Sequence, residues 1–231
     1  MRPYLRPGII ENYACAVHLV YDNIQKKWID VSGKGNHATI TGAVKRDTTN
    51  GEVLAFDGAD DYVELPFAVT QKINAVDKYS HVIWTKARNL AIGRMLMGVQ
   101  SPYDGRDYIS TVQNDDGTLV YSMGIGNYAR TKNTSTAEVE TDKYHLIVKT
   151  VDKTTKTAKL YKNTQLGEVK TGWTWTDITY SLNLGCFYRD DLGHAYFHKC
   201  FIDEYALIVG KVLTLKDIEN IYWEGIRKRW G

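Results

Sequence analysis

Two glycine-rich turns near the start of the chain, each beside residues that alternate between apolar and polar, most constrain its fold. The first turn is Asp30-Val-Ser-Gly-Lys-Gly-Asn-His37, and the second lies within Leu54-Ala-Phe-Asp-Gly-Ala-Asp-Asp-Tyr-Val-Glu-Leu65. Alternation of this kind is typical of a strand with one buried and one solvated face. The spacing predicts a hairpin about Asp57-Gly58, because glycine supplies the positive φ that such turns need.

Strand patterns separated by turn residues recur along most of the chain. In segment 79–86 the alternation places Tyr79, His81, Ile83 and Thr85 on one face, and Asn114-Asp-Asp-Gly117 predicts a hairpin turn. Further strands are predicted at 13–20, 94–99, 107–113, 118–123, 144–151, 157–161, 182–187 and 195–209. Many short strands and few helical windows indicate an all-β sandwich of antiparallel sheets.

The C-terminal segment has a different period. Ile218, Ile221 and Ile226 follow helical spacing, and Thr214 with Asp217 resembles a capping box with aspartate in place of glutamate. We therefore predict a short C-terminal α-helix. No proline-rich or low-complexity linker divides the chain. The expected organisation is an N-terminal arm over residues 1–12, a sandwich over 13–213 and the helix over 214–231.

Bulk composition argues against several classes of protein. The net charge of +2 gives no reason to expect a nucleic-acid partner. No segment has the apolar length of a membrane span or of a secretory signal, so we expect a protein made in the cytoplasm and not inserted in a membrane. Three cysteines without zinc-site spacing, at Cys15, Cys186 and Cys200, are expected to be buried free thiols.

Four segments in order resemble the laminin-G-like branch of the concanavalin A-like lectin and glucanase superfamily. They are residues 30–37 with 56–63, residues 79–84, residues 144–148 with 159–163, and residues 201–207 with 213–218. Tyr144 stands where the family hairpin usually has a tryptophan. The resemblance extends over most of the chain. It implies a two-sheet antiparallel jelly-roll sandwich, closed here by the C-terminal helix.

The glycan-cleaving branches of this superfamily carry two or three carboxylates at alternate positions of one strand, so that all face one cleft. The nearest phrases here are Glu138-Val-Glu140, which precedes a turn, and Asp203-Glu204, whose adjacent side chains point to opposite faces. Neither forms a pair that flanks a sugar bond. We therefore expect no enzymatic activity. Glycoside hydrolysis by an unfamiliar carboxylate pair stays as an alternative.

The resemblance also implies a structural calcium near the closing aspartate of the last long strand, which is Asp203 here. Calcium takes six or more oxygen ligands. The alternative is that Asp203 hydrogen-bonds the turn at residues 30–36 directly. Asp57, Asp60 and Asp61 form a second candidate group, although aspartates in such turns usually cap their own backbone. No other cofactor is expected.

Glycan binding needs aromatic platforms beside polar groups on an accessible surface. The candidates are Trp173 and Trp175, which are two positions apart and so share one face of an extended segment. Tyr103 and Tyr128 are further candidates, in predicted loops. The alternative is that the two tryptophans fill the core or a subunit interface.

A lectin-like sandwich without a secretion signal or a catalytic set fits a virion component, because phage proteins are made in the host cytoplasm. We expect a non-catalytic structural or adhesion protein of a bacteriophage particle, with other virion proteins, copies of itself or cell-surface glycans as partners. The interface candidates pair arginines with aromatic residues and are Arg2, Tyr4, Arg6, Trp223 and Trp230. The alternative is a carbohydrate-binding module of a cellular protein.

Overall fold

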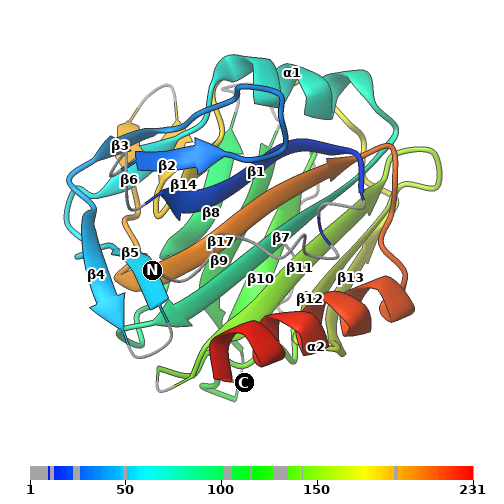
Figure 1. Cartoon of the computed structure of the whole chain (residues 1–231). Coiled ribbons are helices and arrows are strands. Elements are labelled where there is room, and N and C mark those ends of the chain that lie inside the picture. The colour runs from blue at the N-terminus through cyan, green and yellow to red at the C-terminus, as the bar shows by residue number, and fades with distance from the viewer. Residues whose placement is uncertain are drawn as a thin grey trace.

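The protein is a sandwich of two stacked β-sheets with one helix on an outer face and one at an end (Figure 1). A computed structural model describes residues 10, 13–22, 27–48, 51–100, 106–114, 116–126, 135–141, 143–189 and 192–230. The described strands form a nine-stranded and an eight-stranded sheet, in which every pairing but one is antiparallel. The predicted fold class, a two-sheet antiparallel jelly-roll sandwich, is confirmed.

The first sheet contains the longest strands. Its order is β13 (Gln165–Thr171), β12 (Thr157–Lys162), β11 (His145–Asp152), β7 (Lys78–Ala87), β17 (Cys200–Val209), β1 (Cys15–Asp22) and β2 (Lys27–Asp30). β5 (Gly51–Ala55) pairs with β17 and with β4 (Val44–Thr48). The central strands β7, β11 and β17 are buried almost throughout, because this sheet is covered on both faces.

The second sheet forms the other layer of the sandwich. Its order is β10 (Leu119–Ile125), β9 (Arg106–Gln113), β8 (Met95–Gln100), β14 (Asn183–Leu184), β6 (Tyr62–Glu64) and β3 (Thr39–Thr41). A hairpin of β15 (Phe187–Arg189) and β16 (Gly193–Ala195) joins it through β15, which runs parallel to β8.

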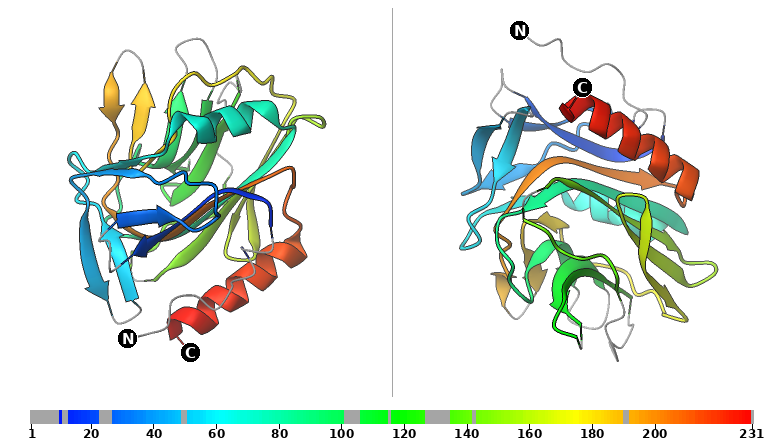
Figure 2. Two further views of the ribbon diagram at one scale, coloured as in Figure 1. Left: turned by 45° about the horizontal axis from the view of Figure 1, so that its top comes forward. Right: turned by 90° about the horizontal axis from the view of Figure 1, so that it is seen from below.

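Two apolar layers hold the sandwich together. One lies between the sheets and includes Phe56, Ile83 and Tyr121. The other lies between the first sheet and α2 (Leu215–Trp230), which crosses the outer face of that sheet (Figure 2). There the ring of Tyr222 stacks on that of Trp84, with 5.9 Å between the ring centroids. The helical spacing of the sequence therefore marked a face that is buried against the sheet.

The helix cap predicted from the sequence is present. The Asp217 amide donates to Thr214 Oγ1 at 3.2 Å, and the Thr214 amide donates to Asp217 Oδ2 at 2.8 Å. Tyr13 and Lys211 also bind the Asp217 carboxylate, at 2.8 and 3.0 Å. Despite the burial of this carboxylate, its hydrogen bonds hold its pKa at about 2.

One predicted hairpin is wrong. Residues 51–55 and 62–64 form β5 and β6, but these strands belong to different sheets, and the turn between them crosses the sandwich. Gly58 in this turn has a φ of 84°, and a Cβ there would lie 2.9 Å from Lys199 Cβ. The glycine is therefore required for the close approach of two chain segments as well as for the turn.

A helix absent from the predictions, α1 (Phe67–Ala75), follows Pro66 and covers one end of the sandwich (Figure 1). Its buried residues are Val69, Thr70 and Ile73, so only a narrow stripe faces the core. The three cysteines are buried free thiols, as expected. Within the described ranges, no helix has both the length and the hydropathy to cross a membrane.

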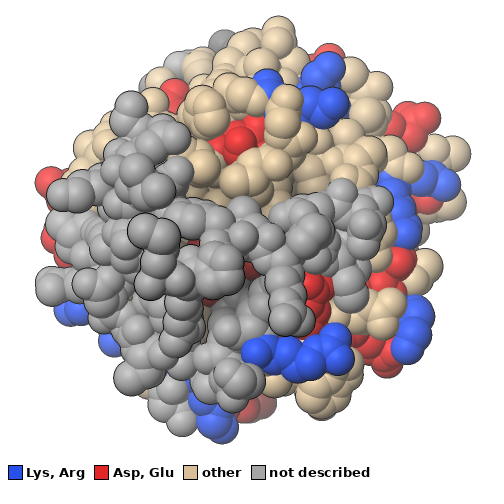
Figure 3. Space-filling model, in the orientation of Figure 1, with Lys and Arg blue, Asp and Glu red and all other residues tan. Residues whose placement is uncertain are grey.

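Charges of both signs are interspersed over the described part of the face drawn in Figure 3. This distribution agrees with the small net charge of +2. No field of one sign covers that part of the surface.

Candidate functional site

A cavity of about 250 Å³ lies on the outer face of the second sheet, where β6 pairs with β14. Val63 and Leu184 on these strands are in the core, so the side chains that alternate with them lie on the outer face. We call this the β6–β14 cavity. The described residues that line it are Glu64, Phe67, Thr179, Tyr180, Ser181, Asn183, Tyr188 and His194.

Two polar side chains lie opposite each other on the floor of this cavity. Glu64 of β6 and Asn183 of β14 are register partners across the sheet. Asn183 is 1% exposed, and its amide nitrogen donates to Ser181 O at 2.9 Å. Its Oδ1 has no hydrogen-bond partner in the described part of the chain. A buried carbonyl oxygen without a partner costs about 1–3 kcal/mol, which a ligand hydroxyl would recover.

Aromatic rings form one wall of the cavity. His194 stacks on Tyr62 with the ring centroids 3.8 Å apart and the planes at 19°. Tyr188 lies opposite His194 in the β15–β16 hairpin, with its ring 5.1 Å away and nearly perpendicular. The ring centroid of Tyr180 lies 5.0 Å from that of Tyr188. Burial lowers the pKa of His194, against the opposing effect of the Glu64 carboxylate, so the imidazole is neutral at neutral pH.

The aromatic surface continues along the sheet beyond the cavity. Phe187 contacts Tyr108 and Tyr196, with ring centroids 5.9 and 6.1 Å apart. Glycines make room for these rings, because a Cβ at Gly98 would lie 2.8 Å from the Phe187 ring and one at Gly124 would lie 2.1 Å from Tyr108. Large aromatic side chains therefore pack closely against the outer face of the sheet.

A second cavity, of about 640 Å³, is larger but has fewer aromatic side chains in its described lining. It lies among β1, the turn after β2 and α1, and its lining includes Cys15, His18, Lys34, Asn36 and Lys72. His18 Nε2 is 2.6 Å from a Glu204 oxygen, and the Asn36 amide donates to Ala16 O at 2.7 Å. The described lining of this larger cavity has two aromatic rings, Tyr13 and His18, whereas the smaller cavity has four, so the smaller cavity suits a ligand that stacks on rings better.

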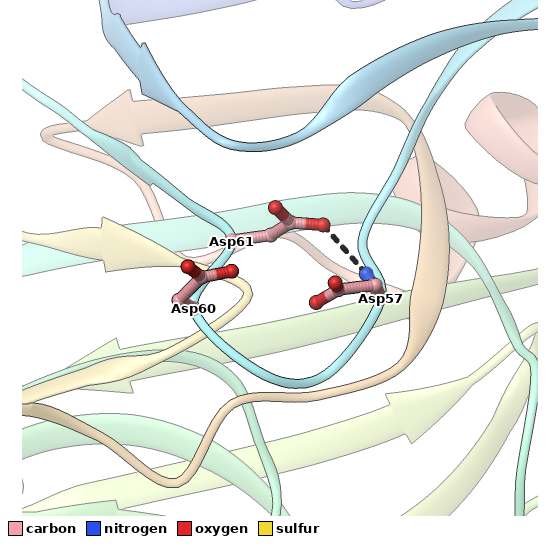
Figure 4. A group of neighbouring side chains, drawn as sticks. All are labelled: Asp57, Asp60 and Asp61. Carbon is pink, nitrogen blue, oxygen red and sulfur yellow. Dashed lines mark hydrogen bonds between the residues drawn. The ribbon is translucent and has the colours of Figure 1, made fainter.

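Two of the three aspartates after β5 bind the backbone of their own turn (Figure 4). The Asp57 amide donates to Asp61 Oδ2 at 2.6 Å, and the Ala59 amide donates to Asp57 Oδ1 at 2.7 Å. Burial and the neighbouring Asp57 and Asp60 charges raise the pKa of Asp61. The carboxylates of Asp57 and Asp61 therefore cap the backbone, as the alternative interpretation of the sequence held.

The calcium prediction at Asp203 stays a prediction. Asp203 lies at the irregularity in β17 where the register with β7 shifts. Among the described residues, the one group of three or more metal-ligating side chains close enough to share an ion is Asp57, Asp60 and Asp61, and it does not include Asp203. The turn at residues 30–36 is held by Asp30, whose carboxylate accepts from the amides of His18, Ser32 and Asn36. Within the described residues, acidic side chains therefore do not gather around Asp203 as calcium ligands.

The structure separates the two candidate tryptophans. Trp173 is 2% exposed and belongs to the core between the sheets, so its ring is not accessible as a sugar platform, and this prediction is corrected. The alternative, that Trp173 fills the core, is the one the structure supports. Trp175 is half-buried, 6.4 Å from the Trp173 ring, and Lys153 Nζ lies 3.9 Å from its ring centroid. One face of Trp175 is therefore already occupied by a cation.

The remaining predicted site residues lie elsewhere. Trp223, on α2, is 57% exposed, which leaves it available for an interface. The backbone of Trp230 ends the same helix. Outside the described residues lie Tyr103, Tyr128, Arg2, Tyr4, Arg6 and the side chain of Trp230.

Two of the four carboxylates considered in the sequence analysis, Glu140 and Glu204, form ion pairs outside this cavity. Glu140 is 2.5 Å from Lys162 Nζ and 3.3 Å from His145 Nε2, and Glu204 pairs with His18. The described lining of the β6–β14 cavity has one carboxylate, Glu64. Glycosidases generally flank the scissile bond with two carboxyl groups.

The residues of the β6–β14 cavity were not found from the sequence. Glu64 stood at a polar position of a correctly predicted strand, and that was the available signal. Its neighbours Asn183, Tyr188 and His194 are more than 100 positions away, and the pairing of β6 with β14 brings them together. Alternation identifies the exposed face of a strand but not the strand beside it.

Comparison with known proteins places these observations in context. A family model described as the concanavalin A-like lectin/glucanases superfamily matches residues 57–219. No curated protein sequence matches the chain. Domain 4 of AbnA, a GH43 extracellular arabinanase from Geobacillus stearothermophilus, solved in complex with arabinotriose, is similar with a TM-score of 0.65 and 20% identity. That match covers 91% of this chain and 98% of the other.

Two further solved structures are similar over part of their length. Trypanosoma rangeli sialidase in complex with the inhibitor DANA has a TM-score of 0.62 and 16% identity, over 89% of this chain and 32% of that chain. The botulinum neurotoxin type G receptor binding domain has a TM-score of 0.59 and 15% identity, over 90% of this chain and 51% of that chain. At such identities the likeness shows a common fold, which hosts many activities.

Proposed function

Because the chain belongs to the concanavalin A-like lectin and glucanase superfamily, we propose that it is a non-catalytic protein that binds a glycan in the β6–β14 cavity. The observation that supports this proposal most directly is that unpaired polar groups lie beside aromatic rings in the β6–β14 cavity. Glu64 and the unpartnered Oδ1 of Asn183 lie beside Tyr188 and His194. Sugars require this combination, since their C–H faces stack on rings while their hydroxyls need polar partners.

The likeness to an arabinanase domain solved with arabinotriose supports the choice of a sugar as ligand. The single carboxylate of the described cavity lining supports binding without cleavage. A binding protein of this kind releases its ligand unchanged. Incubation with polysaccharides is therefore expected to yield no new reducing ends, and their appearance would contradict the non-catalytic part of the proposal.

Replacement of Tyr188 by alanine tests the site itself. The ring of Tyr188 contacts both His194 and Tyr180, so its loss removes the centre of the aromatic wall. We expect at least about a tenfold loss of affinity, or about 1.4 kcal/mol, for any glycan that the intact protein binds on an array.

The matched control is Trp223→Ala, which removes an exposed aromatic residue on α2 at the opposite side of the sandwich. Its affinity for the same glycan should not change. Equal losses in both variants, or no loss in Tyr188→Ala, would place glycan binding outside the β6–β14 cavity.

We further propose that the protein acts within a bacteriophage particle, as its sequence suggested. Exposed apolar side chains on α2, Leu215 at 47% and Trp223 at 57%, support an interface with another virion protein or a second copy. The protein should then remain with purified particles through density-gradient centrifugation. Recovery solely as a free monomer would contradict this role.

A further inference from the structure

The electrostatics of the β6–β14 cavity specify a class of ligand, an inference that rests on the proposed glycan binding. We infer that the cavity selects neutral glycans rich in hydroxyl groups and rejects sugars that carry a carboxylate, such as sialic or uronic acids. The basis is a Glu64 carboxylate that has no ion-pair partner among the described residues and lies beside an acceptor oxygen of Asn183.

The charge of the cavity comes from a single residue. Of the eight described residues that line it, Glu64 alone is charged at neutral pH. The one group there that could carry a compensating positive charge is His194, and its burial keeps the imidazole neutral. Lysine and arginine are absent from the described lining. An anionic sugar would therefore bring a second negative charge into a cavity whose described lining lacks a cation.

Like charges repel strongly in a cavity of this kind. The interaction of two carboxylates is weak in bulk water, but it grows several-fold where protein atoms lower the effective dielectric. Glu64 is half-buried, with Asn183 buried beside it, so its charge is only partly screened by solvent. We expect a carboxylated glycan to bind at least about tenfold more weakly than its neutral counterpart.

The hydrogen-bonding groups point to the same class of ligand. A carboxylate is an acceptor only, and its two oxygens can each accept from one of two neighbouring sugar hydroxyls. The Oδ1 of Asn183 is a further acceptor that lacks a donor. Glu64 and Asn183 thus offer three acceptor oxygens on two adjacent strands, and these oxygens suit a ligand with several O–H donors.

The test compares neutral glycans with the same glycans carrying a terminal sialic or uronic acid, for the wild type and Glu64→Gln at neutral pH and low salt. The wild type is expected to prefer the neutral member of each pair by at least about tenfold. Glu64→Gln keeps the size of the side chain but removes its charge, so the preference should shrink to within about threefold. Asn183→Ala serves as a second variant and should weaken binding of neutral glycans without changing the preference.

The outcomes distinguish a failure of the charge selection from a failure of the proposed glycan binding. If the wild type binds carboxylated glycans as well as neutral ones, or if Glu64→Gln leaves the preference unchanged, the charge selection is wrong although glycan binding stands. If the wild type binds no glycan of either kind, the proposed function itself is wrong. An unchanged far-ultraviolet circular dichroism spectrum and melting temperature of Glu64→Gln exclude misfolding as the cause of a change.

Discussion

Lys149→Met is expected to lower the free energy of unfolding by about 3–5 kcal/mol, because it leaves a buried charge without its partner. Lys149 on β11 and Asp107 on β9 are fully buried, come from opposite sheets, and are in direct contact. Lys149 Nζ also donates to Gly124 O at 2.7 Å. The pair is thus a polar link across an otherwise apolar core, and it joins the two layers of the sandwich.

The carboxylate of Asp107 has further partners that would remain in the variant. Its Oδ2 accepts from Tyr79 Oη at 2.9 Å and lies 2.9 Å from His81 Nε2, whose other ring nitrogen is 2.9 Å from Tyr205 Oη. Lys149 and His81 together hold the pKa of Asp107 well below its usual range, although burial alone would raise it. Without Lys149, less positive charge opposes the rise in the pKa of Asp107 that burial causes.

Urea denaturation followed by circular dichroism measures the loss of stability. The matched control is Lys216→Met on α2, where the side chain is 78% exposed and the change should stay within about 0.5 kcal/mol. The double variant Lys149→Met with Asp107→Leu should recover part of the loss, because it removes both charges. A loss below about 1 kcal/mol for Lys149→Met would show that the pair does not stabilise the sandwich.

The sign of the pH dependence follows from the lowered pKa of Asp107. A carboxyl whose folded pKa is below its unfolded value adds stability above the unfolded pKa of about 4 and loses it as the pH falls toward the folded value. In Lys149→Met, Asp107 loses its lysine partner, so its pKa should rise above that in the wild type, and its protonation at low pH should stabilise the variant. The stability gap between wild type and variant should therefore narrow as the pH is lowered from 7.

Trp173→Ala is expected to cost about 3–5 kcal/mol of stability, the usual loss for a tryptophan removed from a core. Trp173 is 2% exposed, and its ring packs beside Trp175 and against the backbone at Gly126, where an added Cβ would lie 3.3 Å from the ring. Deleting this side chain leaves a cavity that the rigid strands around it cannot fill.

The same variant decides between the two interpretations of Trp173. Denaturation should show a large loss for Trp173→Ala and a smaller one for Trp173→Phe, which keeps an aromatic ring in the core. Glycan affinity, measured under conditions where the variant is still folded, should be unchanged. A fully stable Trp173→Ala variant with lost glycan binding would restore the sugar platform that the sequence suggested.

Local sequence patterns were sufficient to predict most of the individual strands and the C-terminal helix. The alternation along residues 79–86 correctly placed Tyr79, His81 and Ile83 on the inner face of β7, because side-chain direction in a strand depends only on position. The hairpin about residues 114–117 and the capped C-terminal helix were also correct, since their signals lie within a few residues.

Contacts between distant segments could not be derived in the same way. The turn at Gly58 was read as a hairpin, but the strands on its two sides pair with different sheets. Trp173 and Trp175 looked equivalent by spacing, yet one is in the core and the other is half-buried beside Lys153. The burial of a side chain depends on which other elements pack over its segment. The sequence of that segment alone does not specify those elements.

The amino-acid sequence by itself determined the class of fold, since strand period, turn glycines and a helix cap are local properties that any tertiary arrangement must respect. The tertiary structure alone decided the location of the candidate site, by pairing β6 with β14 and placing the β15–β16 hairpin beside them. The physical reason is that a site is a set of distances between residues far apart in the chain. Those distances are set by strand pairing and packing, which depend on the whole molecule.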